Sequence, residues 1–199
     1  MMTSDTIAPR VGLITADRAP LTAARHWREG LDPGPIVAAL AHVPELLDAA
    51  LPFIGQALRG SIADPRTAEL VIVRASALLG CSYCTLTHGA IALDADVTPD
   101  ELRALCARGA VAGGGSHDER EVALLAWVDE VAAGHGDVPD GVARDLAAHV
   151  DDALLVELTA MVGCTIFLNR FCTTLRLPAG ETTLARLAAR GIQPEELAA

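Results

Sequence analysis

The sequence predicts an all-α, single-domain fold, and three observations carry this prediction. Ala and Leu dominate the 51% of residues that are apolar, and both are good helix formers. Residues that favour strands are comparatively scarce, with only 3% aromatic residues. A length of 199 residues is sufficient for one well-buried core. We expect an N-terminal arm over residues 1–34 and one helical domain over residues 35–199.

Prolines and apolar spacing determine the helices expected early in the chain. The arm contains scattered Pro and Gly residues, with one short helix expected around Leu21 to Arg28. From Pro35 the pattern turns helical, and a helix is expected over Pro44 to Arg59. Pro52 lies inside this helix and is expected to kink it or split it in two, because proline lacks the backbone N–H.

The next helix has clearer boundaries. Asp64 can cap the free amides, and Pro65 fits the first helical position. Apolar spacing continues from Glu69 to Leu79, after which Gly80 ends or bends the helix. Cys81 is therefore expected at the beginning of a new helix.

Capping signals also mark the second half of the chain. Thr98, followed by Pro99 and Glu101, is typical of a capping box, and a helix is expected from there through Arg108. The glycine-rich residues 109–116 predict a flexible hinge or loop. Later helices are expected over residues 118–133, 139–149, 152–174 and 181–190.

The sequence contains a possible degenerate internal helical repeat. Residues 69–85 can be aligned with residues 157–173, so that Asn169 stands in place of Cys81. If the repeat is real, the second copy keeps the helical scaffold and lacks the dithiol, which indicates packing rather than a second site.

The charge balance excludes several classes of partner. Fifteen basic residues against 26 acidic ones give a formal net charge of −11. Such a surface repels phosphate backbones and anionic lipid, so we expect no nucleic-acid and no membrane partner. The N-terminus lacks the long apolar core of a secretory signal, and the longest apolar stretch, Met161 to Leu168, is too short to span a bilayer. We therefore expect a cytoplasmic protein, in which thiols are kept reduced.

Cys81 and Cys84 form a CxxC pair, which in a reducing compartment indicates redox chemistry or metal binding. Only the thiolate attacks, and a helix N-terminus stabilises the thiolate form. His88 follows Cys84 by about one helical turn and can exchange a proton with it. Glu69, on the preceding helix, is a candidate to orient His88 if the two helices pack back on each other.

The combination of Glu69, Cys81, Cys84 and His88 resembles the signature of the AhpD-like alkylhydroperoxidases in the carboxymuconolactone decarboxylase superfamily. The surrounding sequence AELVIVRASALLGCSYCTLTHGAIAL is similar to the core helix pair of that family, and DERE, LLAWVDE and FLNRF resemble its second half. The resemblance runs from Pro35 to Leu177. It implies an AhpD-like helical bundle that assembles into trimers or hexamers.

The resemblance also implies a thiol-dependent peroxidase or disulfide reductase. Cys84 would attack the peroxide, and Cys81 would resolve the sulfenic acid to a Cys81–Cys84 disulfide. Glu69 and His88 would relay protons, and an external dithiol donor would restore the pair. The expected partners are a small-molecule peroxide or disulfide substrate, the dithiol donor and further copies of the chain. No bound cofactor and no metal are expected.

Tyr83 departs from the best-studied branch of the family, which has a second histidine between the cysteines. Tyrosine can donate a hydrogen bond but is a poor base near neutral pH, and we expect Tyr83 to line the substrate pocket. Two other functions stay open. One is an enzyme acting on a small carbonyl or lactone with His88 and Glu69 as acid and base, although the decarboxylase branch lacks the CxxC pair. The other is a non-catalytic redox sensor or assembly subunit.

Structural roles are the alternative for several of these residues. Buried cysteines pack well in cores, and a zinc site would need a fourth ligand that is not evident. An acidic residue near the start of a helix also interacts favourably with the helix dipole, which is a structural role for Glu69. Cys106, Cys164 and Cys172 lie in apolar helical patterns and are expected in the core. Arg170 is expected to be buried and paired with a carboxylate.

Overall fold

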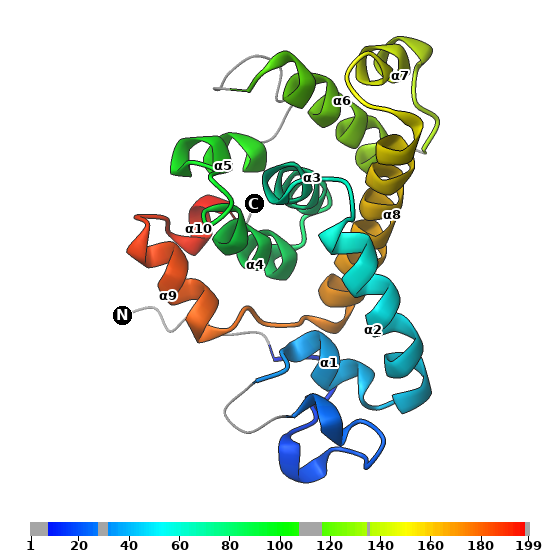
Figure 1. The fold of residues 1–199 in the computed structure, drawn as a ribbon. Helices are drawn as coiled ribbons and strands as arrows, with labels where there is room; N and C mark the ends of the chain where they lie inside the picture. The colour runs from blue at the N-terminus through cyan, green and yellow to red at the C-terminus, as the bar shows by residue number, and fades with distance from the viewer. Residues whose placement is uncertain (1–7, 28–31, 108–116, 135, 198–199) are drawn as a thin grey trace.

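Ten α-helices and two short 3-10 turns account for the regular structure of residues 8–27, 32–107, 117–134 and 136–197, which the computed structural model describes (Figure 1). These residues contain no strand, which confirms the predicted all-α fold. The 3-10 turns are Ala16–Arg18 and Ala24–His26. The helices are α1 (Pro35–Leu40), α2 (Pro44–Arg59), α3 (Pro65–Leu78), α4 (Ser82–Ala92), α5 (Pro99–Cys106), α6 (Glu119–Ala133), α7 (Asp140–Ala147), α8 (Asp152–Leu175), α9 (Glu181–Ala189) and α10 (Pro194–Leu197).

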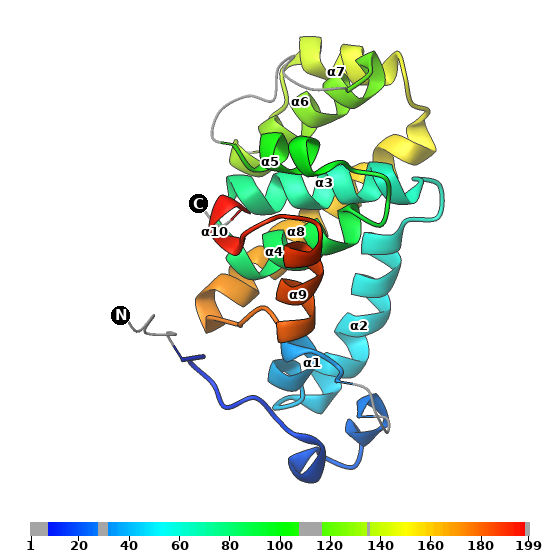
Figure 2. The same cartoon turned by 90° about the vertical axis from the view of Figure 1, so that its left-hand side faces the viewer.

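Helix α3 lies at the centre and separates two parts of the hydrophobic core. It packs against α4, α5, α6 and α8, and Figure 1 shows it nearly end-on among them. Leu70 and Val73 face the part shared with α4, α5 and α9, whereas Val71 and Ile72 face the part shared with α6 and α8. A helix with apolar residues on more than one face is typical of such a buried position. In Figure 2, α6 and α7 lie at the opposite end of the molecule from α1.

The predicted start of α3 and its termination before Gly80 are confirmed. The Asp64 side chain accepts a hydrogen bond from the Thr67 N–H at 2.9 Å, and Pro65 occupies the first turn. Gly80 follows the helix with a φ of +65°, a conformation that strains residues with a Cβ. The chain turns at this glycine, and Cys81 becomes the N-cap of α4.

Helix α2 remains one helix, so of the two expected effects of Pro52, a kink or a split, the split does not occur. The helix runs from Pro44 to Arg59 with Pro52 inside it. Proline removes the hydrogen bond that its N–H would donate to the carbonyl of Asp48, four residues earlier. Both residues are exposed, and water can therefore satisfy the carbonyl that loses its helical partner.

The two copies of the possible repeat differ in their helical structure. The first copy breaks at Gly80 between α3 and α4, whereas the second lies entirely within the continuous helix α8. Leu168 of α8 stands at the position that aligns with Gly80, and it lacks the conformational freedom to reverse the chain. The second copy therefore does not reproduce the helix pair of the first.

Most of the other predicted helices are present, with ends that differ by one or two residues, which is ordinary for helix termini. The helix expected around Leu21 to Arg28 is reduced to the 3-10 turn Ala24–His26 in the described part of that segment. Helix α10 was not predicted, because four residues are too short to show a helical period. The loop predicted over residues 109–116 lies outside the described residues.

By length and composition alone, α8 is a candidate membrane span, with a mean hydropathy of 1.5 over its most apolar window. In the sequence, a membrane span was excluded because the apolar stretch Met161 to Leu168 is short. Helix α8 is longer than that stretch. It packs against α2, α3, α4 and α6, and 44% of the window is buried. Because the core helix of a globular protein passes the same test, this is weak evidence for a membrane span.

The predicted capping box at α5 is present and extends into an ion-pair network. The Thr98 hydroxyl accepts from the Glu101 N–H at 3.2 Å, and the Glu101 carboxylate accepts from the Thr98 N–H at 2.8 Å. Arg66 of α3 donates to the same carboxylate at 2.6 Å. Burial by itself raises the pKa of Glu101, but Arg66 and Thr98 together lower it to about 2.

Replacing Glu101 by glutamine is expected to destabilise the protein at neutral pH but not at pH 2. The pKa of Glu101 is lower in the folded state than in the unfolded chain, so the ionised carboxylate stabilises the fold above the unfolded value of about 4.3. This contribution, about 1 to 3 kcal/mol, is lost as the pH falls through the folded value. Thermal unfolding, measured from pH 7 to pH 2, should show that the gap in melting temperature between wild type and Glu101→Gln closes as the pH falls. A gap that stays constant would contradict the prediction.

Candidate functional site

The two cysteines of the CxxC pair lie at the N-terminus of α4. Cys81 is the N-cap, and its sulfur accepts a hydrogen bond from the backbone N–H of Cys84 at 3.4 Å. Both are free thiols and nearly completely buried, with exposed fractions of 1% and 5%. The unpaired amides and partial positive charge of the helix N-terminus therefore act on these sulfurs at close range.

The structure brings Glu69 and His88 into contact, a contact that sequence spacing alone did not determine. Glu69 lies on α3 and His88 on α4, which pack against each other across the turn at Gly80. The His88 Nδ1 lies 3.0 Å from the Glu69 Oε2, and both side chains are largely buried. A carboxylate at Nδ1 orients the ring and leaves Nε2 for proton exchange.

Cys172 of α8 joins the dithiol, and sequence reasoning missed this. Its thiol is 1% exposed and packs in the same apolar cluster as Cys81 and Cys84. Cys172 is therefore a core residue, as expected, but one that contacts the candidate site. Cys106 and Cys164, the other two cysteines, belong to different clusters. Cys172 lies more than 80 residues beyond the CxxC pair, so no local pattern could reveal it.

The three neighbouring thiols shift the pKa values of one another in opposite directions. The thiols of Cys172 and Cys84 and the backbone N–H of Cys84 lower the pKa of Cys81 below its ordinary value, although burial opposes the shift. The same contacts and burial raise the pKa of the Cys84 thiol. The hydrogen bond to Cys81 also raises the pKa of Cys172. These opposite shifts favour the thiolate form at Cys81 over the other two cysteines.

Apolar side chains cover the three sulfurs. They come from the N-terminal arm, α1, α4 and α8, and are Val11, Leu13, Ile36, Tyr83, Phe171 and Leu175. Arg10 ties the arm to α8, since its backbone N–H donates to the Leu175 carbonyl at 2.9 Å and its guanidinium to the Thr174 carbonyl at 2.8 Å. Burial raises the pKa of Tyr83, so its phenol stays protonated at neutral pH. In the described part of the chain, the three cysteines are thus nearly completely buried beneath these side chains.

Asn169 and Arg170, neighbours on α8, have different environments. Asn169 is buried and accepts a hydrogen bond from the Ser76 hydroxyl of α3 at 3.1 Å. Arg170 is exposed, so the expected burial against a carboxylate is wrong for this residue. The buried arginine is Arg74 of α3, which pairs with Asp129 at 2.6 Å. Helical phase explains the difference, because Arg170 points away from the face of α8 that meets α3.

Three side chains elsewhere have the composition of a metal site. Glu101, His117 and Glu121 have potential ligand atoms within 4.8 Å of one another. The guanidinium of Arg66, however, lies 2.6 Å from the Glu101 carboxylate and 2.7 Å from that of Glu121. His117 donates to or accepts from Glu121 at 2.8 Å. Because Arg66 already pairs with both carboxylates, the cluster is best described as an ion-pair network that joins α3, α5 and α6.

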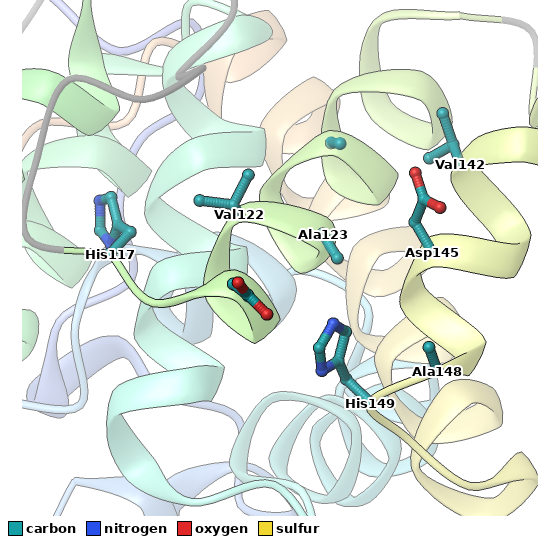
Figure 3. A pocket seen from close by; sticks show the side chains of 9 residues that line it. His117, Val122, Ala123, Val142, Asp145, Ala148 and His149 are labelled. Atoms are coloured by element: carbon teal, nitrogen blue, oxygen red, sulfur yellow. The ribbon is translucent and has the colours of Figure 1, made fainter.

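A cavity of about 420 Å³ lies between α6 and α7 (Figure 3). Figure 3 shows Val122 and Ala123 lining it from α6, and Asp145 and His149 from the α7 side. Its described lining contains neither thiol of the CxxC pair and neither member of the Glu69–His88 pair. This cavity is therefore separate from the candidate redox site.

A model of the Carboxymuconolactone decarboxylase family matches residues 44–134. The matched segment spans α2 to α6 and includes Glu69, both cysteines of the CxxC pair and His88. A comparison with curated protein sequences finds no match.

Several solved structures share the fold at low sequence identity. A protein from Silicibacter sp. TM1040, described as an uncharacterized peroxidase-related protein, has a TM-score of 0.76 and 17% identity, over 92% of this chain and 97% of its own. The alkylhydroperoxidase AhpD core protein from Ralstonia eutropha JMP134 has a TM-score of 0.74 and 20% identity, over 88% and 94%. The debrominase Bmp8, in complex with 2,3,4-tribromopyrrole, has a TM-score of 0.75 and 17% identity, over 94% and 100%.

The chain shares the helical fold of AhpD-like and peroxidase-related proteins. The model of the Carboxymuconolactone decarboxylase family matches the central helices of this fold, so the sequence match and the shared architecture agree. The family match and the shared fold confirm the resemblance to the AhpD-like superfamily that the CxxC pair, Glu69 and His88 indicated in the sequence.

Proposed function

We propose that this protein is a thiol-dependent oxidoreductase that reduces a small peroxide or disulfide with its dithiol. The family match and the structural neighbours support an enzyme with peroxidase-related or decarboxylase-like chemistry. The observation that carries the proposal is the hydrogen-bonded dithiol at the N-terminus of α4, with His88 one turn later and held by Glu69. A nucleophile, a resolving thiol and an oriented acid–base group are thus in one place.

In the proposed reaction the Cys81 thiolate attacks one peroxide oxygen and the O–O bond breaks. The departing alkoxide takes up a proton, which His88 supplies through Nε2 while Glu69 stabilises its charged ring. The Cys84 thiol then attacks the sulfenic sulfur of Cys81, expels water and closes the disulfide. Two electrons pass from the two thiols to the peroxide, and an external dithiol donor restores the pair by thiol–disulfide exchange.

This order of attack reverses the one that the family resemblance implies, in which Cys84 attacks first. The reason is electrostatic, since the contacts of Cys81 favour its thiolate whereas those of Cys84 favour its protonated form. Tyr83 is proposed as a pocket residue that donates a hydrogen bond to the substrate. It lies in the apolar cover of the thiols, and its phenol stays protonated.

A brominated aromatic ring is a second candidate substrate for the same dithiol. The debrominase Bmp8 matches this chain along its entire length, and the aromatic side chains of Tyr83 and Phe171 in the cover suit a flat apolar molecule. In such a reaction the two thiols deliver two electrons, hydrogen replaces bromine on the ring, and bromide and a proton are released. The protein product is again the Cys81–Cys84 disulfide.

The test measures consumption of hydrogen peroxide, cumene hydroperoxide and tribromopyrrole with dithiothreitol as donor. Cys81→Ser is expected to abolish turnover of the true substrate. Cys106→Ser is the matched control, because that thiol is also buried but lies in a different core cluster, and its turnover should equal that of the wild type. Wild-type turnover by the double variant Cys81→Ser/Cys84→Ser would exclude chemistry of the CxxC pair and favour the carbonyl or lactone enzyme. One oxidation of the dithiol without sustained turnover would favour the redox sensor.

We also propose that the chain forms a homo-oligomer, a trimer or a hexamer, in the cytoplasm. Large apolar side chains exposed on the single chain support an association surface. They include Phe53, Val156 and Phe167, with exposed fractions of 59%, 69% and 47%.

A further inference from the structure

The redox site contains one more thiol than the proposed reaction uses. Cys172 approaches the dithiol from α8, whereas Cys81 and Cys84 lie at the start of α4. All three thiols are buried, and Ala39 and Leu177 complete the buried part of the cluster. Since α8 also carries Cys164 in a separate cluster, proximity to the dithiol is specific to one of its two cysteines.

The position of Cys81 allows it to pair with either neighbour. It precedes α4 as the N-cap, with backbone angles of −90° and 88° that are not helical. Its side chain is therefore not confined to the rotamers that a helical position imposes. Cys84 is one turn away on the same helix, and Cys172 faces Cys81 from a different helix. One sulfur thus has two thiol neighbours in the same buried cluster.

We propose that Cys172 is a second resolving cysteine, which can close a Cys81–Cys172 disulfide in place of Cys84. This inference rests on the proposed function, because it requires Cys81 to be oxidised by a peroxide. It adds a third member to the redox site and predicts a disulfide between α4 and α8 as well as the one within the CxxC pair.

Resolution by Cys172 moves the same atoms and electrons as resolution by Cys84. The Cys81 thiolate reduces the peroxide and becomes a sulfenic acid. The Cys172 sulfur attacks it, the S–O bond breaks, and the hydroxide leaves as water with the Cys172 proton. Cys84 can then attack the Cys81 sulfur, release Cys172 as a thiol and form the Cys81–Cys84 disulfide for the external donor. Cys172 would thus shorten the lifetime of the sulfenic acid and protect Cys81 from irreversible oxidation.

The test removes Cys84 and asks which thiol resolves the sulfenic acid. Cys84→Ser, treated with one equivalent of hydrogen peroxide, is expected to yield a Cys81–Cys172 crosslink in non-reducing peptide mass spectrometry. In Cys84→Ser/Cys172→Ser, dimedone should instead trap the Cys81 sulfenic acid, with at least a tenfold larger adduct fraction than in Cys84→Ser. Cys84→Ser/Cys164→Ser is the matched control on the same helix and should behave as Cys84→Ser.

Accumulation of the sulfenic acid in Cys84→Ser without a crosslink to Cys172 would overturn the inference and leave the proposed function intact. An unreacted Cys81 in the wild type would instead overturn the proposed function. Cys172→Ala, a second small substitution at the buried position, should repeat the result of Cys172→Ser. Far-ultraviolet circular dichroism of each variant confirms that the comparison is made between folded proteins.

Discussion

Replacing Arg74 by methionine is expected to lower the free energy of unfolding by about 3 to 5 kcal/mol. Arg74 is 1% exposed at the centre of the fold. Its Nε and Nη2 donate to the two Asp129 oxygens at 2.6 and 2.9 Å, and its Nη1 donates to the carbonyls of Leu105 and Ala107 at 3.0 Å each. Methionine fills part of the volume but leaves a carboxylate and two carbonyls without these donors. Urea unfolding followed by circular dichroism measures the loss.

Arg103→Met is the control for this prediction. Arg103 also bridges helices, through Glu196 at 2.8 Å, but its side chain is 39% exposed, so water can replace its partners. Arg103→Met should lower the free energy of unfolding by much less than Arg74→Met. A further variant, Arg74→Met/Asp129→Leu, should recover part of the stability because it also removes the unpaired carboxylate. Equal losses at Arg74 and Arg103 would show that burial of the ion pair is not what stabilises α3 against α6.

Replacing His88 by alanine is expected to slow oxidation of the dithiol by peroxide by about 10²- to 10⁴-fold, the usual effect of losing a positioned acid–base group. The two thiols remain, so the number of thiols oxidised at the end of the reaction should be unchanged. Glu69→Gln keeps a hydrogen-bonding partner for Nδ1 but not its charge, and a smaller effect is expected. Stopped-flow measurement of thiol loss across a range of pH separates the rate from the endpoint.

His149→Ala is the matched control, since this histidine lines the separate cavity between α6 and α7 (Figure 3). Its rate should equal that of the wild type. Oxidation of His88→Ala at an unchanged rate would reject the proton relay while leaving the dithiol chemistry in place. Loss of oxidisable thiols in His88→Ala would indicate that the substitution disturbs the packing of α4 instead.

Local signals in the sequence were sufficient for much of the fold. Asp64 and Thr98 cap helices through contacts with residues three positions later, and Gly80 supplies a positive φ that the turn requires. Each of these effects acts within one helical turn, so a short stretch of sequence contains all the partners. Pro52 shows the limit of such reasoning, because the cost of a missing N–H depends on whether solvent reaches the carbonyl it leaves.

The sequence by itself determined the helical class, the helix break at Gly80 and the placement of the CxxC pair at a helix N-terminus, because propensity, capping and glycine conformation are local properties. Only the tertiary structure decided that Glu69 meets His88, that Cys172 joins the dithiol and that Val11 and Leu13 of the N-terminal arm pack against the thiol cluster. It also decided that Arg74 and not Arg170 is the buried arginine. These contacts join different segments of the chain, and the packing of the helices, which no spacing within one segment encodes, brings them together.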